Sequence, residues 1–152
     1  GVLNLQGRVN MYNIRCPFEV GEAIVRKLRH SARVLVVDFH AESPEEKEAL
    51  GLFLDGSVSA VVGTHTHVQS ADERILPRGT AFMTDLGMTG PRDGVIGMKR
   101  EISLQRSLLQ IPFKMEVDES PALIMGAAFS VDTATGRCSS IRRIREEVPV
   151  TG

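Results

Sequence analysis

The stretch Val58-Ser59-Ala60-Val61-Val62-Gly63-Thr64-His65-Thr66-His67 joins an apolar run to two of the four histidines in the chain. In an extended chain, residues two positions apart point to the same side. His65 and His67 would then face one way and Thr66 the other, whereas in a helix the two histidines would diverge. We therefore expect the pair at a strand end or in a loop, where it is either a metal-binding pair or a surface His-x-His without a ligand.

Two further segments upstream of this stretch predict a strand and a helix. Arg33–Phe39 (RVLVVDF) is a continuous apolar run, which is typical of a strand covered on both faces. Ser43-Pro44-Glu45-Glu46 predicts the start of a helix that runs to about Leu54, with the serine as N-cap and the second glutamate closing a capping box. Val58–Val62 is the next buried strand. The order strand, helix, strand within ~30 residues predicts a βαβ-like unit.

Three histidines follow the ends of these two strands. His40 closes the first strand, and His65 and His67 follow the second. In open α/β sheets, functional sites form at the carboxyl ends of the strands. Because neighbouring parallel strands end at the same edge, we expect the three imidazoles to come together there, and imidazole is a common metal ligand.

The other elements follow from apolar periodicity and turn residues. We expect strands at Val2–Gln6 and Thr80–Thr84, a helix from Pro17 with Val20, Ile24 and Leu28 on one face, a helix at Met98–Leu109 with Ile102 and Leu109 on one side, a half-buried strand at Phe113–Val117, and antiparallel strands at Ala122–Val131 and Cys138–Arg145. Arginines in the last strand indicate the solvated face of an edge strand.

The composition is that of an ordinary globular domain, with 152 residues, 42% hydrophobic, 24% charged and a net charge of −1. A chain with no basic excess and 5% aromatic residues gives no sign of a nucleic-acid partner. Cys16 and Cys138 form no paired framework, so we interpret them as reduced thiols in a cytoplasmic protein. The apolar run Leu123–Val131 is too short to cross a bilayer, and no membrane partner is expected.

Four segments carry a resemblance to a known family. They are Val36–Glu42 (VVDFHAE), Ala60–Gln69 (AVVGTHTHVQ), Arg74–Pro77 (RILP) and Thr84–Pro91 (TDLGMTGP). In this order they resemble the bacterial YmdB-type phosphodiesterases, a group of calcineurin-like metallophosphoesterases. Each motif alone is weak, but the combination covers nearly all of the chain and is specific.

The resemblance implies an α/β fold in which two sheets form a sandwich with flanking helices. It also implies a site for two divalent transition metals (Fe, Mn or Zn) and hydrolysis of small phosphodiesters, with 2′,3′-cyclic nucleotides as the usual substrates. By the same resemblance, His40 and His65 bind one metal and His67 binds the other. Two adjacent cations can clamp a phosphoryl group and acidify a bound water. From the residues alone, one zinc ion bound by all three histidines is an open alternative.

The family's remaining site residues have no counterpart in this chain. The resemblance places an early Asp, a Glu-Asn pair and the Asn-His element with the catalytic histidine upstream of Gly1, and it assigns no ligand role to Asp38 or Glu42. We therefore expect residues 1–152 to be a single incomplete metallophosphoesterase domain, its C-terminal portion, without a catalytic residue of its own. The alternative is a non-catalytic module that binds a metal weakly or self-associates as a homo-oligomer, because three imidazoles leave the repulsion between two cations uncompensated.

A glycine-rich segment, Gly87–Gly97, follows the strand that ends at Thr84. Glycines allow a backbone to come close to a phosphate, so Thr89 and Gly90 are candidate substrate-binding residues through their N–H groups. A plain connecting turn is the alternative interpretation of the same glycines.

Overall fold

The computed structural model describes residues 1–148 and divides the chain into two compact units. The first unit consists of Gly1–Gly87 and Ala127–Arg143, and the second of Met88–Gly126 and the residues from Ile144 onward. Both contain strands, and helices occur in both, so the expected α/β class is confirmed. The expectation that residues 1–152 form one incomplete domain stays a prediction.

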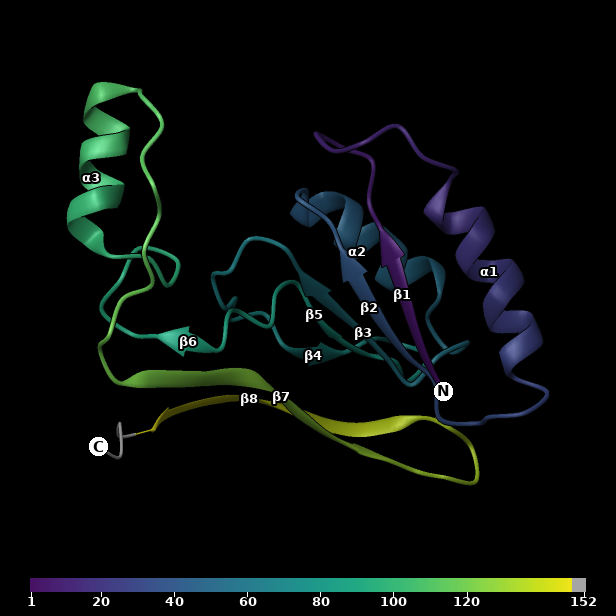
Figure 1. The fold of residues 1–152 in the computed structure, drawn as a ribbon. Coiled ribbons are helices and arrows are strands. Elements are labelled where there is room, and N and C mark those ends of the chain that lie inside the picture. Colours follow the sequence, from purple (N-terminus) through teal and green to yellow (C-terminus); the bar gives the residue numbers. More distant parts are fainter. Residues whose placement is uncertain (149–152) are drawn as a thin grey trace. The chain divides into compact units, whose positions relative to one another are not determined.

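The first unit is built on a five-stranded sheet with the order β1-β2-β3-β5-β4 (Figure 1). Its strands are β1 (Val2–Gln6), β2 (Val36–His40), β3 (Ala60–Thr64), β4 (Arg74–Ile75) and β5 (Ala81–Met83). The first three and β5 are parallel, and β4 is antiparallel to β5. The helices α1 (Pro17–Leu28) and α2 (Pro44–Phe53) make the crossovers that parallel neighbours need. The predicted βαβ unit is therefore confirmed, and β4 was missed.

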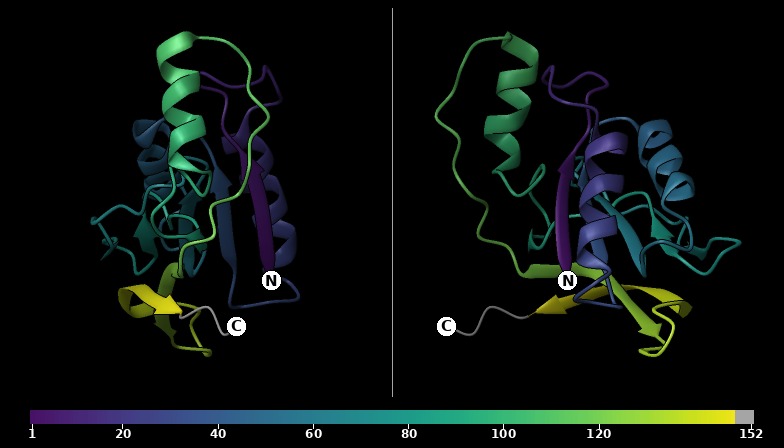
Figure 2. Two further views of the ribbon diagram at one scale, coloured as in Figure 1. Left: turned by 60° about the vertical axis from the view of Figure 1, so that its left-hand side comes forward. Right: turned by 90° about the vertical axis from the view of Figure 1, so that its right-hand side faces the viewer.

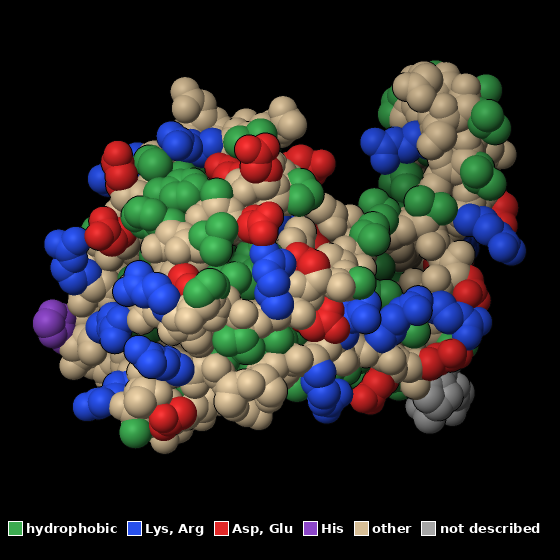
Figure 3. All heavy atoms as spheres, turned by 180° about the vertical axis from the view of Figure 1, so that it is seen from behind, with side chains coloured by type: hydrophobic (Ala, Val, Ile, Leu, Met, Phe, Trp, Pro, Cys, Tyr) green, Lys and Arg blue, Asp and Glu red, His purple; other side chains and the backbone are tan. Residues whose placement is uncertain are grey.

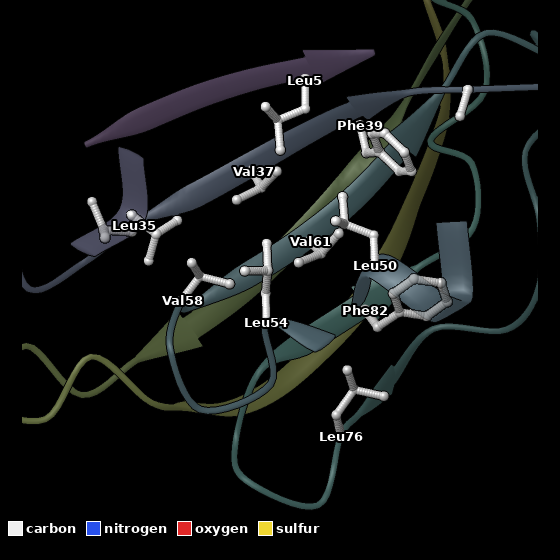
Figure 4. Packing of buried hydrophobic residues seen from close by; sticks show 12 residues of the cluster. Leu5, Leu35, Val37, Phe39, Leu50, Leu54, Val58, Val61, Leu76 and Phe82 are labelled. Carbon is white, nitrogen blue, oxygen red and sulfur yellow. The ribbon is translucent and has the colours of Figure 1, made fainter. Parts of the chain in front are cut away.

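Both helices cover the same face of this sheet (Figure 2). Alternate strand residues such as Val37 and Phe39 point to that face and are fully buried, and Leu50 of α2 packs against them (Figure 4). The opposite face is covered in part by Phe129, Val131, Cys138 and Ile141 from the two long strands described below, which pack on Ala60 and Ala81. Covering on both faces explains why β3 and the start of β2 consist of consecutive apolar residues.

The start of α2 corrects one sequence-based prediction. Ser43 is the N-cap as expected, and its Oγ accepts a hydrogen bond from the N–H of Glu46 at 3.2 Å. Glu46 does not complete a capping box, because its buried carboxylate instead accepts hydrogen bonds from the N–H groups of Arg8, at 3.0 Å, and Val9, at 3.2 Å. This carboxylate thus anchors the chain just after β1 ends.

Two long strands, β7 (Ala122–Val131) and β8 (Cys138–Val148), contribute residues to both units. In the second unit, the short strand β6 (Gly90–Pro91) pairs antiparallel with Ala122 and Leu123, and β8 lies at the other edge of this three-stranded sheet. The edge position agrees with its arginine-rich sequence.

The expected helix in the second unit is confirmed as α3 (Arg100–Leu109), and one other expectation there needs correction. Leu109, on the predicted apolar side of α3, is 58% exposed. The strand expected at 113–117 does not form, and only Val117 makes a β-bridge there, with Met98. Alternating residues form a strand only where a partner strand offers a ladder, and no described strand lies against this segment.

The surface carries mixed charge. On the face drawn in Figure 3, basic, acidic and apolar side chains are interspersed, as the net charge of −1 leads one to expect. Among residues 1–148, no helix combines the length and apolar character that a membrane span requires.

Candidate metal centre

The strands β2 and β3 lie side by side and run in parallel (Figure 1). Their pairing brings His40 and His65 together at the carboxyl edge of the sheet. His40 is paired with Thr64, so His65 follows directly beside it. The two rings are nearly perpendicular, at 87°, with centroids 4.8 Å apart. Nε2 of His40 lies 3.1 Å from Nδ1 of His65. The structure thus brings these two residues together as expected, and their role as ligands stays a prediction.

A chain of hydrogen bonds orients the His40 ring through its Nδ1 atom. Its Nδ1 lies 3.2 Å from the hydroxyl of Thr64, and that hydroxyl donates to Asp38 Oδ1 at 2.8 Å. The side-chain amide of Asn4 donates to the other oxygen of Asp38 at 2.9 Å. Asp38 therefore acts on His40 through Thr64 and does not touch the imidazole.

Glu42 lies on the outer side of His65. Its Oε2 is 2.9 Å from Nε2 of His65, and about half of the Glu42 side chain is exposed. Sequence reasoning did not assign Glu42 to the site. The available signal was its place in the loop that follows His40, at the same sheet edge.

His67 is not part of this cluster. It is exposed, and its ring has no hydrogen bond, ion pair or ring contact with the residues that the structure describes. The backbone takes positive φ angles at His65 (110°) and His67 (65°), which are strained for non-glycine residues and tend to occur at functional sites. Within residues 1–148, no group of three or more His, Cys, Asp or Glu side chains is arranged to hold a metal.

The donor set nevertheless fits part of a metal shell. Two imidazole nitrogens bound to one metal at ~2.1 Å lie about 3.0 Å apart at a right angle and about 3.4 Å apart in a tetrahedral site. The observed 3.1 Å between His40 Nε2 and His65 Nδ1 falls between these two values. Imidazole nitrogens suit Zn or Fe better than Ca or Mg, and Mn fits where oxygen ligands complete the shell.

A buried ion pair supports the loop that carries His65 and His67. Asp85, directly after β5, accepts a hydrogen bond from the N–H of Thr66 at 3.1 Å and another from the N–H of Gly87 at 2.9 Å. Nζ of Lys47 in α2 lies 2.8 Å from the same carboxylate. These contacts join α2, the segment after β5 and the loop that carries the two histidines. Sequence reasoning missed this ion pair: Lys47 looks like a surface charge of a helix, and Asp85 was noted only as part of the TDLGMTGP segment.

Close approach of two strands explains Gly63 in the Gly-Thr-His-Thr-His motif. A Cβ at this position would lie 1.8 Å from the carbonyl oxygen of Thr84 and 2.8 Å from Cδ of Lys47. Only glycine fits here, and the missing side chain lets the end of β3 lie directly against the segment that contains Asp85.

Asp72 links the segment that follows His67 to Thr84, directly after β5. Its carboxylate accepts from Ser70 at 2.6 Å and from the Thr84 hydroxyl at 2.5 Å. Burial tends to raise the pKa of Asp72, but these hydrogen bonds outweigh it and hold the pKa below its usual value of 3.8.

The candidate substrate-binding residues Thr89 and Gly90 lie in the second unit. The Thr89 hydroxyl accepts a hydrogen bond from the N–H of Met125 at 3.3 Å. Gly90 lies in β6 and pairs with Leu123 of β7. Contact of either residue with a substrate stays a prediction.

Comparison with known proteins identifies relatives over almost the whole chain. A family described as "YmdB-like protein" matches residues 1–144. A 2′,3′-cyclic-nucleotide 2′-phosphodiesterase of Bacillus subtilis is 44% identical over 94% of this chain and 54% of its own length. A putative phosphatase/phosphodiesterase of Mycoplasma pneumoniae is 40% identical over 85% of this chain and 46% of its own length. The chain thus spans about half the length of these relatives.

Solved structures agree. A hypothetical protein from Thermus thermophilus superposes with a TM-score of 0.89 at 34% identity, over 97% of this chain and 57% of that one. A structure described as a novel phosphatase from Mycoplasma pneumoniae gives a TM-score of 0.86 at 36% identity, over 96% and 52%. With a family match over 144 of 152 residues and a shared fold, the chain belongs to the YmdB-like protein family.

Proposed function

We propose that the protein, expressed from its complete coding sequence, hydrolyses phosphodiesters with the help of bound divalent metals, and that 2′,3′-cyclic nucleotides are its substrates. The relative from Bacillus subtilis bears the name of that activity at 44% identity. The single structural observation that carries the proposal is the 3.1 Å approach of His40 Nε2 and His65 Nδ1 at the carboxyl edge of the sheet.

In this proposal His40 and His65 hold one metal and His67 holds a second, with Fe, Mn or Zn as the candidates. Bound metals would polarise the phosphoryl group and lower the pKa of a water. The chain's own contribution is to orient the imidazoles: the strands place His40 and His65, and the hydrogen bond from Thr66 to Asp85 fixes the backbone between His65 and His67. Thr89 and Gly90 are proposed to approach the phosphate. The free thiols of Cys16 and Cys138 fit a cytoplasmic location.

The test is hydrolysis of 2′,3′-cyclic AMP with Mn²⁺ by the protein from its complete coding sequence. We expect turnover that falls by at least about 100-fold in His67→Ala, since loss of a metal ligand removes transition-state stabilisation. His30→Ala is the matched control, because His30 is an exposed histidine just beyond α1. No turnover, or equal rates for His67→Ala and wild type, would refute the proposal.

A second function is favoured by one observation. No group of three or more ligands is assembled within residues 1–148. The 152-residue chain by itself would then be a non-catalytic module that binds metal weakly or self-associates. Elemental analysis separates the two cases, because two tightly held metals per 152-residue chain would contradict the module.

A further inference from the structure

We propose that Glu42 and the Thr64–Asp38 pair are positioning residues that fix opposite tautomers in His65 and His40, so that both inward nitrogens present lone pairs to one cation. This inference rests on the proposed function, because it takes His40 and His65 as ligands of one metal. It extends the site by three residues that support the ligands without binding the metal.

The tautomer of His40 follows from counting protons. A carboxylate only accepts hydrogen bonds, so the Thr64 hydroxyl uses its one proton to donate to Asp38 Oδ1 at 2.8 Å. The Thr64 oxygen can then only accept from His40, at 3.2 Å, and Nδ1 of His40 must carry a proton. In the neutral ring, Nε2 is left with the lone pair.

The tautomer of His65 follows in the same way, with the two nitrogens exchanged. Glu42 Oε2 lies 2.9 Å from Nε2 of His65, within ion-pair distance, and a carboxylate so close favours the tautomer with the proton on Nε2, because a lone pair there would face the negative oxygen. In the neutral ring, Nδ1 is left with the lone pair. Each histidine thus turns its protonated nitrogen toward an outer oxygen, Thr64 Oγ1 for His40 and Glu42 Oε2 for His65, which is how ligating histidines are commonly oriented in metal sites.

The consequence lies between the two rings. The nitrogens left with lone pairs, Nε2 of His40 and Nδ1 of His65, are the atoms that face each other at 3.1 Å. Two such lone pairs repel unless a shared proton or a cation lies between them. A metal ion that both nitrogens bind would take the place of that proton. The outer contacts with Thr64 and Glu42 therefore favour the arrangement in which both nitrogens can bind a cation.

Asn4 and the strand register hold Asp38 in place. Asn4 Nδ2 donates to Asp38 Oδ2 at 2.9 Å, and Asn4 is paired with Asp38 between β1 and β2. Asp38 is in turn paired with Val62 of β3, two residues before Thr64. The relay from Asp38 through Thr64 to His40 is thus built on three adjacent strands of the sheet.

The experiment uses the protein from its complete coding sequence and two readouts other than activity. The first is the affinity for Mn²⁺ by titration calorimetry, and the second is the nitrogen NMR shifts of the two imidazoles without metal. Thr64→Val keeps the shape but removes the hydroxyl, whereas Thr64→Ser restores it. Glu42→Ala removes the outer carboxylate, and Glu45→Ala is its control, an exposed glutamate in the first turn of α2.

We expect Thr64→Val and Glu42→Ala each to weaken Mn²⁺ binding about 10- to 100-fold. The NMR shifts should show that His40 in Thr64→Val and His65 in Glu42→Ala populate both tautomers. Thr64→Ser and Glu45→Ala should match wild type in both readouts. Unchanged affinity and unchanged tautomers in Thr64→Val and Glu42→Ala would overturn the inference. If His40→Ala still abolished binding in that case, the proposed function would stand without it; absence of Mn²⁺ binding in wild type would overturn both.

Discussion

Nζ of Lys47 lies 2.8 Å from Oδ2 of Asp85, and both side chains are almost fully buried, at 1% and 2% exposure. The pair joins the middle of α2 to the segment after β5. Because Asp85 also accepts from the N–H groups of Thr66 and Gly87, the same carboxylate fixes the loop that carries His65. Charges are buried in proteins at a cost, so this pair contributes only while both members are present.

We therefore expect Lys47→Met and Asp85→Asn each to lower the free energy of unfolding by ~3–5 kcal/mol, because each leaves one buried charge without its partner. The double variant should lose clearly less than the sum of the two. Urea denaturation of the four proteins measures this coupling. Arg26→Ala is the control, since it breaks an exposed pair with Glu22 and should cost under about 0.5 kcal/mol. Strictly additive losses would show that the buried charges do not stabilise each other.

Gly63→Ala tests the close approach of β3 to the segment after β5. The added Cβ would lie 1.8 Å from the Thr84 carbonyl oxygen, so the strand ends must separate. We expect a loss of at least about 3 kcal/mol in unfolding free energy, as for other strained substitutions in a packed interior. Gly126→Ala in β7 has nothing within 4 Å of the new Cβ and should change stability little. Thermal denaturation compares the two, and equal melting temperatures would be inconsistent with the described contact.

Asp72 predicts a dependence of stability on acid. Burial tends to raise the pKa of Asp72, but hydrogen bonds from Ser70 and Thr84 prevail and lower it below 3.8. The folded state therefore prefers the ionised form. The stabilisation is complete above the unfolded value and is lost as the pH falls through 3.8 and the lower folded value.

Asp72→Asn should accordingly cost about 1 kcal/mol at pH 7 and flatten the loss of stability on acidification. Denaturant midpoints between pH 7 and pH 3 measure both effects. Glu45→Gln, at an exposed position, should leave the acid profile as in wild type. A profile for Asp72→Asn as steep as that of wild type would mean that the hydrogen bonds do not favour the carboxylate.

Local pattern predicted the part of the fold that places His40 and His65. The apolar run before His40, the Ser43 N-cap and the apolar run before His65 each identify an element from neighbouring residues, and the rules for parallel strands then predict the shared edge. The meeting of His40 and His65 could be inferred without knowing any side-chain contact.

Residues that act across the fold could not be found in this way. Glu46 looked like half of a capping box, but its partners Arg8 and Val9 lie 38 and 37 positions away. Lys47 and Asp85 are also 38 positions apart and look like ordinary surface charges in sequence. The strand expected at 113–117 is the converse case. Its alternating pattern is present in the sequence, but no partner strand lies against it among the residues that the structure describes.

The metal content of His40→Ala, measured on the protein from its complete coding sequence, tests the central claim most directly. If His40 and His65 hold one metal, wild type and His30→Ala should contain two metals per chain by elemental analysis. His40→Ala should contain about one less and should lose hydrolysis of 2′,3′-cyclic AMP. Two tightly held metals and a normal rate in His40→Ala would contradict the account.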